Sequence, residues 1–191
     1  MELILASTSP WRREQLARLG LPFQCVDPAV DEDVWKARLT DPRELAGTLA
    51  REKARAVAAQ HPEAVVIGGD QLVSFGSTIL GKPGTAEGAV EQLLQLAGQT
   101  HELLTAVCLC HHGRELNHLD VTRLTMRSLD RGALTRYVAA DDPVGCAGSY
   151  MLEQRGITLF ERIESADHTA IIGLPLIALT GLLRQLGFEV P

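Results

Sequence analysis

Two adjacent arginines follow three small hydroxyl residues near the beginning of the sequence, in the stretch ASTSPWRR at residues 6–13. The apolar run of residues 2–6 is long enough for one buried strand. Pro10 suits the first turn of a helix, because the N–H that proline lacks has no partner there. Such a turn surrounds one point with free backbone N–H groups, a helix dipole and the guanidinium groups of Arg12 and Arg13. The stretch predicts an anion site, although a capped surface helix with solvated arginines would show the same pattern.

A lysine falls within the apolar face of a long predicted helix. The helix has a complete start signal, with Asp41 as N-cap, Pro42 at the first position and Glu44 closing a capping box, and it extends to about His61. Its apolar residues span an arc of roughly 140°; they are Leu45, Ala46, Leu49, Ala50 and Val57. Lys53 lies near the middle of this arc, where a buried ammonium group needs an anion or a carboxylate beside it. We therefore predict a functional role for Lys53, with extension of its side chain to solvent as the alternative.

An aspartate follows two glycines at the end of a predicted buried strand at residues 64–67. Gly68 and Gly69 would let a ligand come close to the backbone. Asp70 and Gln71 would then stand on a rigid element. A turn aspartate without a chemical role fits the same pattern equally well.

Three adjacent carboxylates at residues 31–33 follow a second predicted short strand at residues 23–26. Such a group usually forms a solvated turn. It also supplies the hard oxygen ligands that Mg²⁺ or Mn²⁺ prefers. Both interpretations remain open from these residues alone.

Residues 76–82 match the first seven positions of the phosphate-binding pattern G-x-x-x-x-G-K-[ST], but Pro83 occupies the eighth. Proline removes the hydroxyl that binds the metal and a backbone N–H that binds phosphate. We therefore reject a P-loop. Lys82 becomes a single cation on a stiff loop, suited to contact a phosphate.

Helices and strands alternate through the remaining sequence. We predict helices at residues 85–97, 130–139 and 176–187, strands at 100–112, 116–126 and 157–163, and a glycine-bearing polar turn at 145–153. No repeat or linker separates them. The mixture favours an α/β fold with one extended mixed β-sheet and flanking helices.

The composition is that of an ordinary globular chain, with 46% apolar and 22% charged residues. The net charge of −6 disfavours a nucleic-acid groove as the main surface. Met1 leads directly into an apolar run, so no signal peptide is expected, and no stretch is long enough for a membrane span. We expect a cytoplasmic protein whose four cysteines are reduced thiols in or near the core.

The charged residues together suggest one type of chemistry. Two arginines, two lysines and several carboxylates, without a P-loop or a nucleophile–base pair, suit attack of water on a polyphosphate with a divalent metal. Arginine and lysine would hold phosphate oxygens, the metal would neutralise developing charge, and a carboxylate would orient or deprotonate the water.

The sequence resembles the Maf family of nucleoside triphosphate pyrophosphatases. The resemblance covers nearly the whole chain in order and is carried by residues 3–13 (LILASTSPWRR), 30–32 (VDE), 52–54 (EKA), 69–70 (GD), 81–83 (GKP), 147–150 (AGSY) and 173–176 (GLPL). It implies one domain over residues 1–191, with a fold akin to inosine triphosphate pyrophosphatases and two lobes around a deep cleft. It also implies hydrolysis of the α–β anhydride to a monophosphate and pyrophosphate.

The family positions give each of the site residues a role. Asp70 is implied as the proton acceptor, and Glu32 with Asp70 as ligands of a divalent cation, Mg²⁺ or Mn²⁺. The implied phosphate contacts are Ser7, Arg12, Arg13, Lys53 and Lys82.

Three further positions resemble the branch of the family that acts on 7-methyl-GTP: Trp11, Gln71 and Glu153. The branch acting on dTTP and UTP would carry arginine, threonine and glutamine there. Gln154 departs from the family, which usually has glycine at this position.

The resemblance leaves two functions of different classes open. The first is a pyrophosphatase that removes modified nucleotides, with dTTP or UTP as alternative substrates. The second is a non-catalytic, nucleotide-binding regulator of septum formation. The expected partner is a nucleoside triphosphate, without nucleic acid or membrane, and a homodimer is one possible assembly.

Overall fold

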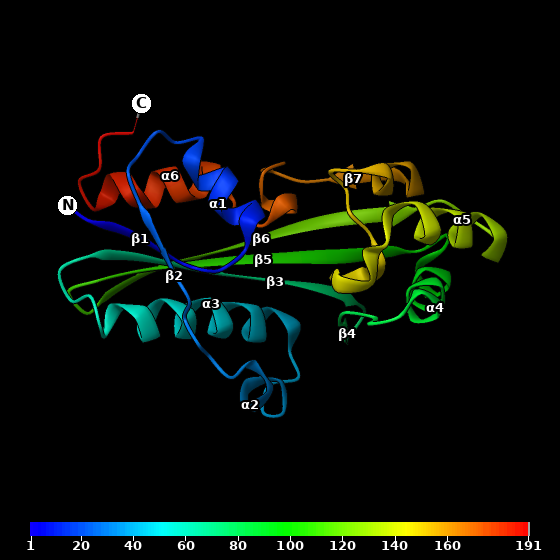
Figure 1. Cartoon of the computed structure of the whole chain (residues 1–191), viewed down its shortest axis with the longest axis horizontal. Helices are drawn as coiled ribbons and strands as arrows, with labels where there is room; N and C mark the ends of the chain where they lie inside the picture. Colours follow the sequence, from blue (N-terminus) through cyan, green and yellow to red (C-terminus); the bar gives the residue numbers. More distant parts are fainter. Residues whose placement is uncertain (191) are drawn as a thin grey trace. The chain divides into compact units, whose positions relative to one another are not determined.

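A seven-stranded mixed sheet organises the computed structural model, which describes residues 1–190 (Figure 1). The strand order is β2-β1-β3-β5-β6-β7, and β4 pairs with β3. Strand β1 is parallel to both β2 and β3, whereas β4 is antiparallel to β3 and β7 is antiparallel to β6. The strands are β1 (Leu3–Ala6), β2 (Gln24–Val26), β3 (Val65–Phe75), β4 (Thr78–Leu80), β5 (Thr100–His111), β6 (Arg114–Met126) and β7 (Phe160–Glu164). The expected α/β fold with a mixed sheet is confirmed.

Six α-helices and four short 3₁₀ helices accompany the sheet in the described residues. The α-helices are α1 (Pro10–Ala17), α2 (Glu32–Lys36), α3 (Pro42–Ala58), α4 (Ala86–Leu96), α5 (Arg131–Asp141) and α6 (Leu176–Gln185). The 3₁₀ helices are η1 (Pro143–Gly145), η2 (Ala147–Ser149), η3 (Arg155–Leu159) and η4 (Ala170–Ile172). Asp41 is the N-cap of α3 as predicted, and Ser9, Thr85 and Asp130 likewise accept from backbone N–H groups at the beginnings of their helices.

The chain forms two compact units. The first contains residues Met1–Gln71, Thr105–Asp120 and Asp167–Pro191, and the second contains Leu72–Leu104 and Val121–Ala166.

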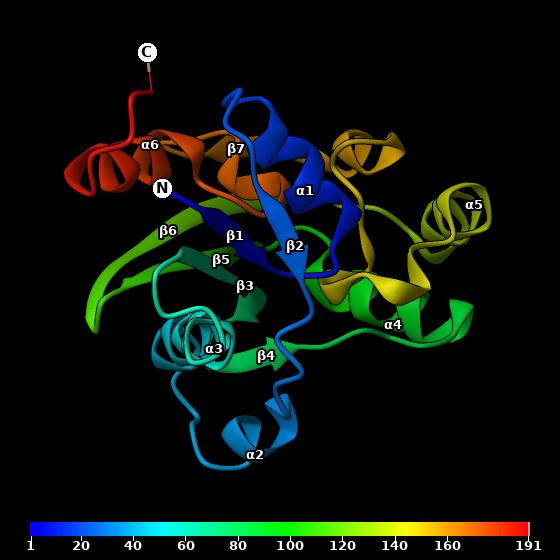
Figure 2. The ribbon, with the colours of Figure 1, turned by 60° about the vertical axis from the view of Figure 1, so that its left-hand side comes forward.

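In the first unit, helices α1 and α6 lie on one side of the sheet and α3 lies on the other (Figures 1 and 2). The core under α1 and α6 includes Leu5, Leu16, Ile67, Leu109 and Leu179. On the opposite face, α3 comes so close to β3 that a Cβ on Gly68 would overlap the carbonyl oxygen of Ala50. The prediction that this glycine makes room for a ligand was therefore wrong: it makes room for the backbone of a helix.

In the second unit, α4 and α5 pack together, and Arg131 pairs with Glu87 at 3.0 Å and Glu91 at 2.6 Å. The predicted strand at 157–163 begins later, at Phe160, because residues 155–159 form a 3₁₀ helix. Gly156 packs against the backbone of Met151 and donates its N–H to the Met151 carbonyl at 3.1 Å. This local turn excludes an extended conformation.

The four cysteines are free thiols. Cys108 and Cys110 are buried on one face of β5 with their Sγ atoms 3.8 Å apart. Cys25 is exposed, so the prediction that it lies in or near the core was wrong.

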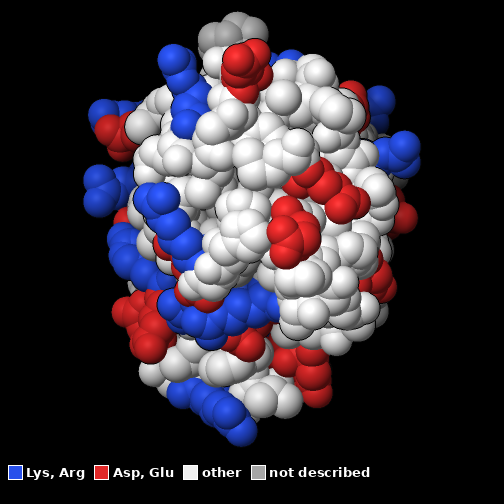
Figure 3. Space-filling model, turned by 90° about the vertical axis from the view of Figure 1, so that its left-hand side faces the viewer, with Lys and Arg blue, Asp and Glu red and all other residues white. Residues whose placement is uncertain are grey.

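Within residues 1–190, no helix is long and apolar enough to cross a membrane. The face in Figure 3 carries acidic and basic side chains intermixed.

Candidate active site

The ammonium group of Lys53 lies between two carboxylates in the first unit. Its Nζ atom is 2.6 Å from Glu32 Oε1 and 2.7 Å from Asp70 Oδ1, and its side chain is 11% exposed. The lysine in the apolar stripe is therefore neutralised inside the protein, and the alternative of extension to solvent was wrong. Three segments far apart in the sequence meet at this nitrogen.

Each of the three residues stands on a well-defined element. Lys53 belongs to α3, whose apolar face turns it toward the sheet, and Asp70 lies within β3. Glu32 is the first residue of the short helix α2, for which Asp31 is the N-cap. The acidic run thus begins a helix and does not form a simple solvated turn, and only Glu32 of its three carboxylates reaches Lys53.

The two carboxylates differ in their protonation behaviour. Burial raises the pKa of the Asp70 carboxyl, although the charges of Lys53 and Arg12 act in the opposite direction. Partial burial also acts to raise the pKa of Glu32, but hydrogen bonds from Lys53 and Lys36 lower it to about 2. The site therefore holds one carboxylate suited to accept a proton and one that stays ionised.

The carboxylates also fit a divalent cation. Asp70 Oδ2 is buried and has no hydrogen-bond partner among residues 1–190, so it is free to coordinate. The same residues contain no group of three His, Cys, Asp or Glu side chains arranged around one point. Mg²⁺ commonly takes only one or two protein carboxylates and completes its shell with water and phosphate oxygens. Glu32 and Asp70 match that donor set.

Arg12 extends from α1 toward the same centre. Its Nε donates to the carbonyl oxygen of Gly173 at 3.2 Å. Burial lowers the pKa of its guanidinium group, while the negative charges of Asp70 and Glu32 oppose this shift. The loop before it is held locally, because Ser7 Oγ accepts from the Ser9 N–H at 3.1 Å and Ser9 Oγ from the Arg12 N–H at 3.4 Å.

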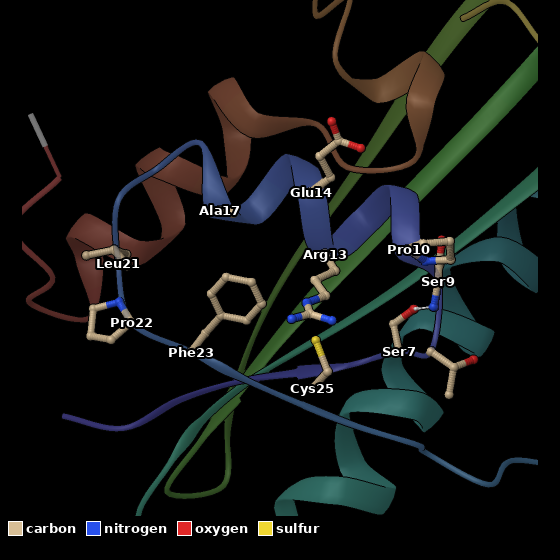
Figure 4. Close-up of a pocket in the computed structure, with 11 residues that line it drawn as sticks. Ser7, Ser9, Pro10, Arg13, Glu14, Ala17, Leu21, Pro22, Phe23 and Cys25 are labelled. Carbon is tan, nitrogen blue, oxygen red and sulfur yellow. Dashed lines mark hydrogen bonds between the residues drawn. The ribbon is translucent and has the colours of Figure 1, made fainter.

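Arg13 points in a different direction from Arg12. It lines a hollow of about 900 Å³ beside α1, together with Ser7, Phe23 and Cys25 (Figure 4). The side chain of Arg13 lies beside Phe23 and Cys25 in this view. The structure thus places Arg12 near Lys53, Glu32 and Asp70, and Arg13 in a separate hollow. The sequence had predicted that the two arginines form one cluster.

Gln71 is engaged within the protein. Its Nε2 donates to Thr105 Oγ1 at 3.0 Å and to the carbonyl oxygens of Ala170 at 3.0 Å and Ile171 at 3.1 Å. Thr105 Oγ1 donates to the Ala170 carbonyl as well, at 2.9 Å. The expected base-specificity residue therefore uses its amide nitrogen to fix the 3₁₀ turn η4.

Sequence reasoning missed the polar residues that hold the segment 167–177. The carboxylate of Asp167 accepts from the N–H groups of Thr169 at 2.9 Å and Ile177 at 2.8 Å, and Thr169 Oγ1 accepts from the Leu176 N–H at 2.8 Å. These bonds cap α6, whose N-cap residue Pro175 has no side-chain acceptor. Nothing in the local pattern marked Asp167, because its role depends on a helix that begins nine residues later.

The other expected site residues are exposed. Trp11, on α1, is 43% exposed. In the second unit, Lys82 and Glu153 are both exposed. Burial raises the pKa of the Cys146 thiol, the charge of Glu153 raises it further, and the charge of Lys82 lowers it. Gln154, where the family usually has glycine, has φ −121°, which any residue adopts.

Comparison with known proteins gives the family of the chain. The model of the Maf-like protein family matches residues 2–186. The chain is 47% identical over 184 residues to the 7-methyl-GTP pyrophosphatase of Bdellovibrio bacteriovorus, covering 96% of both chains. It is 48% identical over 189 residues to the protein of that name from Xanthomonas axonopodis pv. citri, covering 99% of this chain and 98% of the relative. The Pseudomonas putida protein of that name is 43% identical over 193 residues, with both chains covered completely.

One solved structure is also similar. It is the nucleoside-triphosphatase / dITP/XTP pyrophosphatase of Mycobacterium abscessus, with a TM-score of 0.45, 15% identity, and 68% of this chain and 76% of that chain covered. The family match, together with relatives that align over nearly the full length, shows that this chain belongs to the Maf family.

Proposed function

We propose that this protein hydrolyses the α–β anhydride of a nucleoside triphosphate to the monophosphate and pyrophosphate, with 7-methyl-GTP as the preferred substrate. The observation that carries the proposal is the cluster of Lys53, Glu32 and Asp70, in which a buried carboxylate keeps one oxygen without a partner among the described residues. Relatives at 43–48% identity that are named 7-methyl-GTP pyrophosphatase support the choice of substrate.

Asp70 is the proton acceptor in this mechanism. Its raised pKa brings it closer to the working pH than an ordinary carboxylate, which improves a general base. Asp70 takes the proton of the attacking water, and pyrophosphate leaves from the other side of the phosphorus. Glu32 stays ionised while Asp70 changes its protonation state, so Lys53 keeps one negatively charged partner throughout.

Lys53 and Arg12 bind and neutralise the phosphate chain. The guanidinium group of Arg12 can donate two parallel hydrogen bonds to phosphate oxygens, and the ammonium group of Lys53 acts as a point charge. We include Ser7, Arg13 and Lys82 as further phosphate contacts because their types suit that role, although Ser7 and Arg13 line the hollow beside α1 and not the centre around Lys53. A Mg²⁺ or Mn²⁺ ion held by Glu32 and Asp70 would neutralise charge developing on the phosphate oxygens.

The side chains of Trp11 and Glu153 suit recognition of a 7-methylguanine base. N7-methylation gives guanine a delocalised positive charge, and an exposed indole such as Trp11 attracts such a ring by about 0.5–2 kcal/mol. A carboxylate such as Glu153 accepts from the N1–H and N2–H donors together, whereas a glutamine offers a donor to a pyrimidine carbonyl. Gln71 contributes indirectly, through the turn that its amide holds.

A panel of triphosphates tests this function. Pyrophosphate release from 7-methyl-GTP, GTP, dTTP and UTP is measured with Mg²⁺ and with Mn²⁺, and we expect fastest release from 7-methyl-GTP. Comparable cleavage of UTP would contradict the base assignment while leaving the reaction intact. Nucleotide-dependent thermal protection without turnover would favour the non-catalytic regulator.

Exchanging the base-reading residues sharpens the test. Trp11→Arg combined with Glu153→Gln should narrow or reverse the preference for 7-methyl-GTP, because the stacking ring and the acceptor carboxylate are both lost. Inhibition by pyrophosphate, which has no base, should remain unchanged in the same variant. An unchanged ratio between the rates for 7-methyl-GTP and UTP would rule out both residues as specificity determinants.

A further inference from the structure

Gln15 is a buried amide in the first unit that the proposed chemistry does not use. It lies on α1, three residues after Arg12, and is 3% exposed. Its Nε2 donates to the carbonyl oxygen of Thr169 at 2.7 Å. Its Oε1 is buried and has no hydrogen-bond partner among residues 1–190. Native proteins rarely leave such an acceptor unpaired, because the loss of its hydration is expensive.

The unpaired oxygen faces the same small space as the Arg12 side chain. Gly173 has φ +136°, and around the point where its Cβ would lie are Arg12 Cγ at 3.3 Å, Arg12 Nε at 3.4 Å and Gln15 Oε1 at 3.9 Å. Glycine at this position leaves that space open. The amide oxygen of Gln15 and the guanidinium stem of Arg12 therefore lie beside the same gap.

Gln15 also acts on Arg12 through the backbone. The carbonyl of Thr169, which Gln15 holds, belongs to the turn that ends at Gly173, and the carbonyl of Gly173 accepts from Arg12 Nε. That bond is 3.2 Å long, at the outer limit for N–H···O, so it fixes the guanidinium group only loosely. While Nε is held there, the two Nη groups remain available for an anion.

We propose that Gln15 is a positioning residue for Arg12. Its amide nitrogen fixes the turn that presents the Gly173 carbonyl, and its free Oε1 is the acceptor that receives the Arg12 guanidinium group when that group turns toward a phosphate. The inference rests on the proposed pyrophosphatase function, which makes Arg12 a phosphate contact.

Binding of inorganic tripolyphosphate, measured by calorimetry, tests the proposal without turnover. Gln15→Met keeps the length of the side chain and removes both polar atoms, so tripolyphosphate should bind about 3- to 100-fold more weakly, the range typical of coupled neighbours. In an Arg12→Met background the same substitution should have no further effect. Equal weakening in both backgrounds would overturn the proposal, because Gln15 would then act independently of Arg12.

A control variant shows whether the effect belongs to the position of Gln15. Gln24→Met, at an exposed glutamine of the same unit that bonds Glu2, is the matched control and should bind like the wild type.

Steady-state kinetics give a second readout. Gln15→Met should raise KM for the triphosphate and change kcat little, because a better-oriented Arg12 strengthens binding of substrate and transition state together. A fall in kcat at unchanged KM would overturn the proposal. If the wild type releases no pyrophosphate from any triphosphate, the proposed function fails, whereas the tripolyphosphate cycle still decides the role of Gln15.

Discussion

Two cations on helix α3, Lys53 and Arg55, make ion pairs of similar length in opposite surroundings. Lys53 is 11% exposed and contacts Glu32 and Asp70 at 2.6 and 2.7 Å. Arg55 is 51% exposed and contacts Glu115, with Nε and Nη2 on the two carboxylate oxygens at 2.5 and 3.2 Å. The distances therefore do not distinguish the pairs. Burial distinguishes them. Water screens the charges of an exposed pair, whereas a buried pair is unscreened and bears the full cost of desolvation.

The contrast shows why only one of the two clusters suits catalysis. A buried carboxylate with a raised pKa, one of whose oxygens has no partner in the described part of the chain, is held in an unfavourable state that substrate or metal binding can relieve. The Arg55–Glu115 pair already satisfies both partners at the surface. Four substitutions test this difference, and we describe them from the largest expected effect to the smallest.

Asp70→Asn should lower kcat by about 10²–10⁴, because the amide does not accept the proton of the attacking water. The melting temperature should change little, since Glu32 still neutralises Lys53 and asparagine keeps an acceptor oxygen. Pyrophosphate release and a thermal melt on the same preparation check both expectations. Turnover close to that of the wild type would remove Asp70 from the mechanism.

Lys53→Met should reduce turnover and also destabilise the fold by roughly 3–5 kcal/mol, because it leaves buried Asp70 without its cation. The measurement is urea unfolding. Combining Lys53→Met with Asp70→Asn removes both charges and should recover most of the lost stability while leaving the protein inactive. A double variant no more stable than Lys53→Met alone would contradict the ion-pair explanation.

Glu32→Gln should move the acid limb of kcat to lower pH. The negative charge of Glu32 raises the pKa of Asp70, so its removal lowers that pKa, and the base stays deprotonated further into acid. The pH profile is recorded at saturating metal, because Glu32 is also a proposed metal ligand. A limb that stays in place or moves to higher pH would separate Glu32 from the titration of Asp70.

Arg55→Met should have the smallest effect. An exposed ion pair contributes about 0–1 kcal/mol, and within residues 1–190 the Arg55 side chain pairs with Glu52 and Glu115. Turnover should equal that of the wild type, and the urea midpoint should shift only slightly. Loss of activity comparable to that of Lys53→Met would show that the two ion pairs on α3 are not separate.

Much of the fold was predictable because its signals are local. The helix of residues 42–58 has its N-cap, its proline and its apolar stripe within the helix itself, and Lys53 stood out against that stripe. The first residues of β3, 65–67, form an apolar run that predicts a strand, but the strand continues to Phe75, so Asp70 lies within it and not at its end as expected. The start of β7 was misplaced, because the turn before it depends on Gly156 packing against Met151.

The amino-acid sequence by itself determined the mixed α/β fold, the place of Lys53 in a buried stripe and the resemblance that led to the family. Only the tertiary structure decided which charges meet. It brought Glu32 and Asp70 to Lys53 and sent Arg12 and Arg13 in different directions. It also placed the amide nitrogens of Gln15 and Gln71 where they donate hydrogen bonds to backbone carbonyls about 100 residues or more away. The reason is physical: periodicity and caps act over one or two helical turns, whereas burial and charge pairing act between segments that only folding brings together.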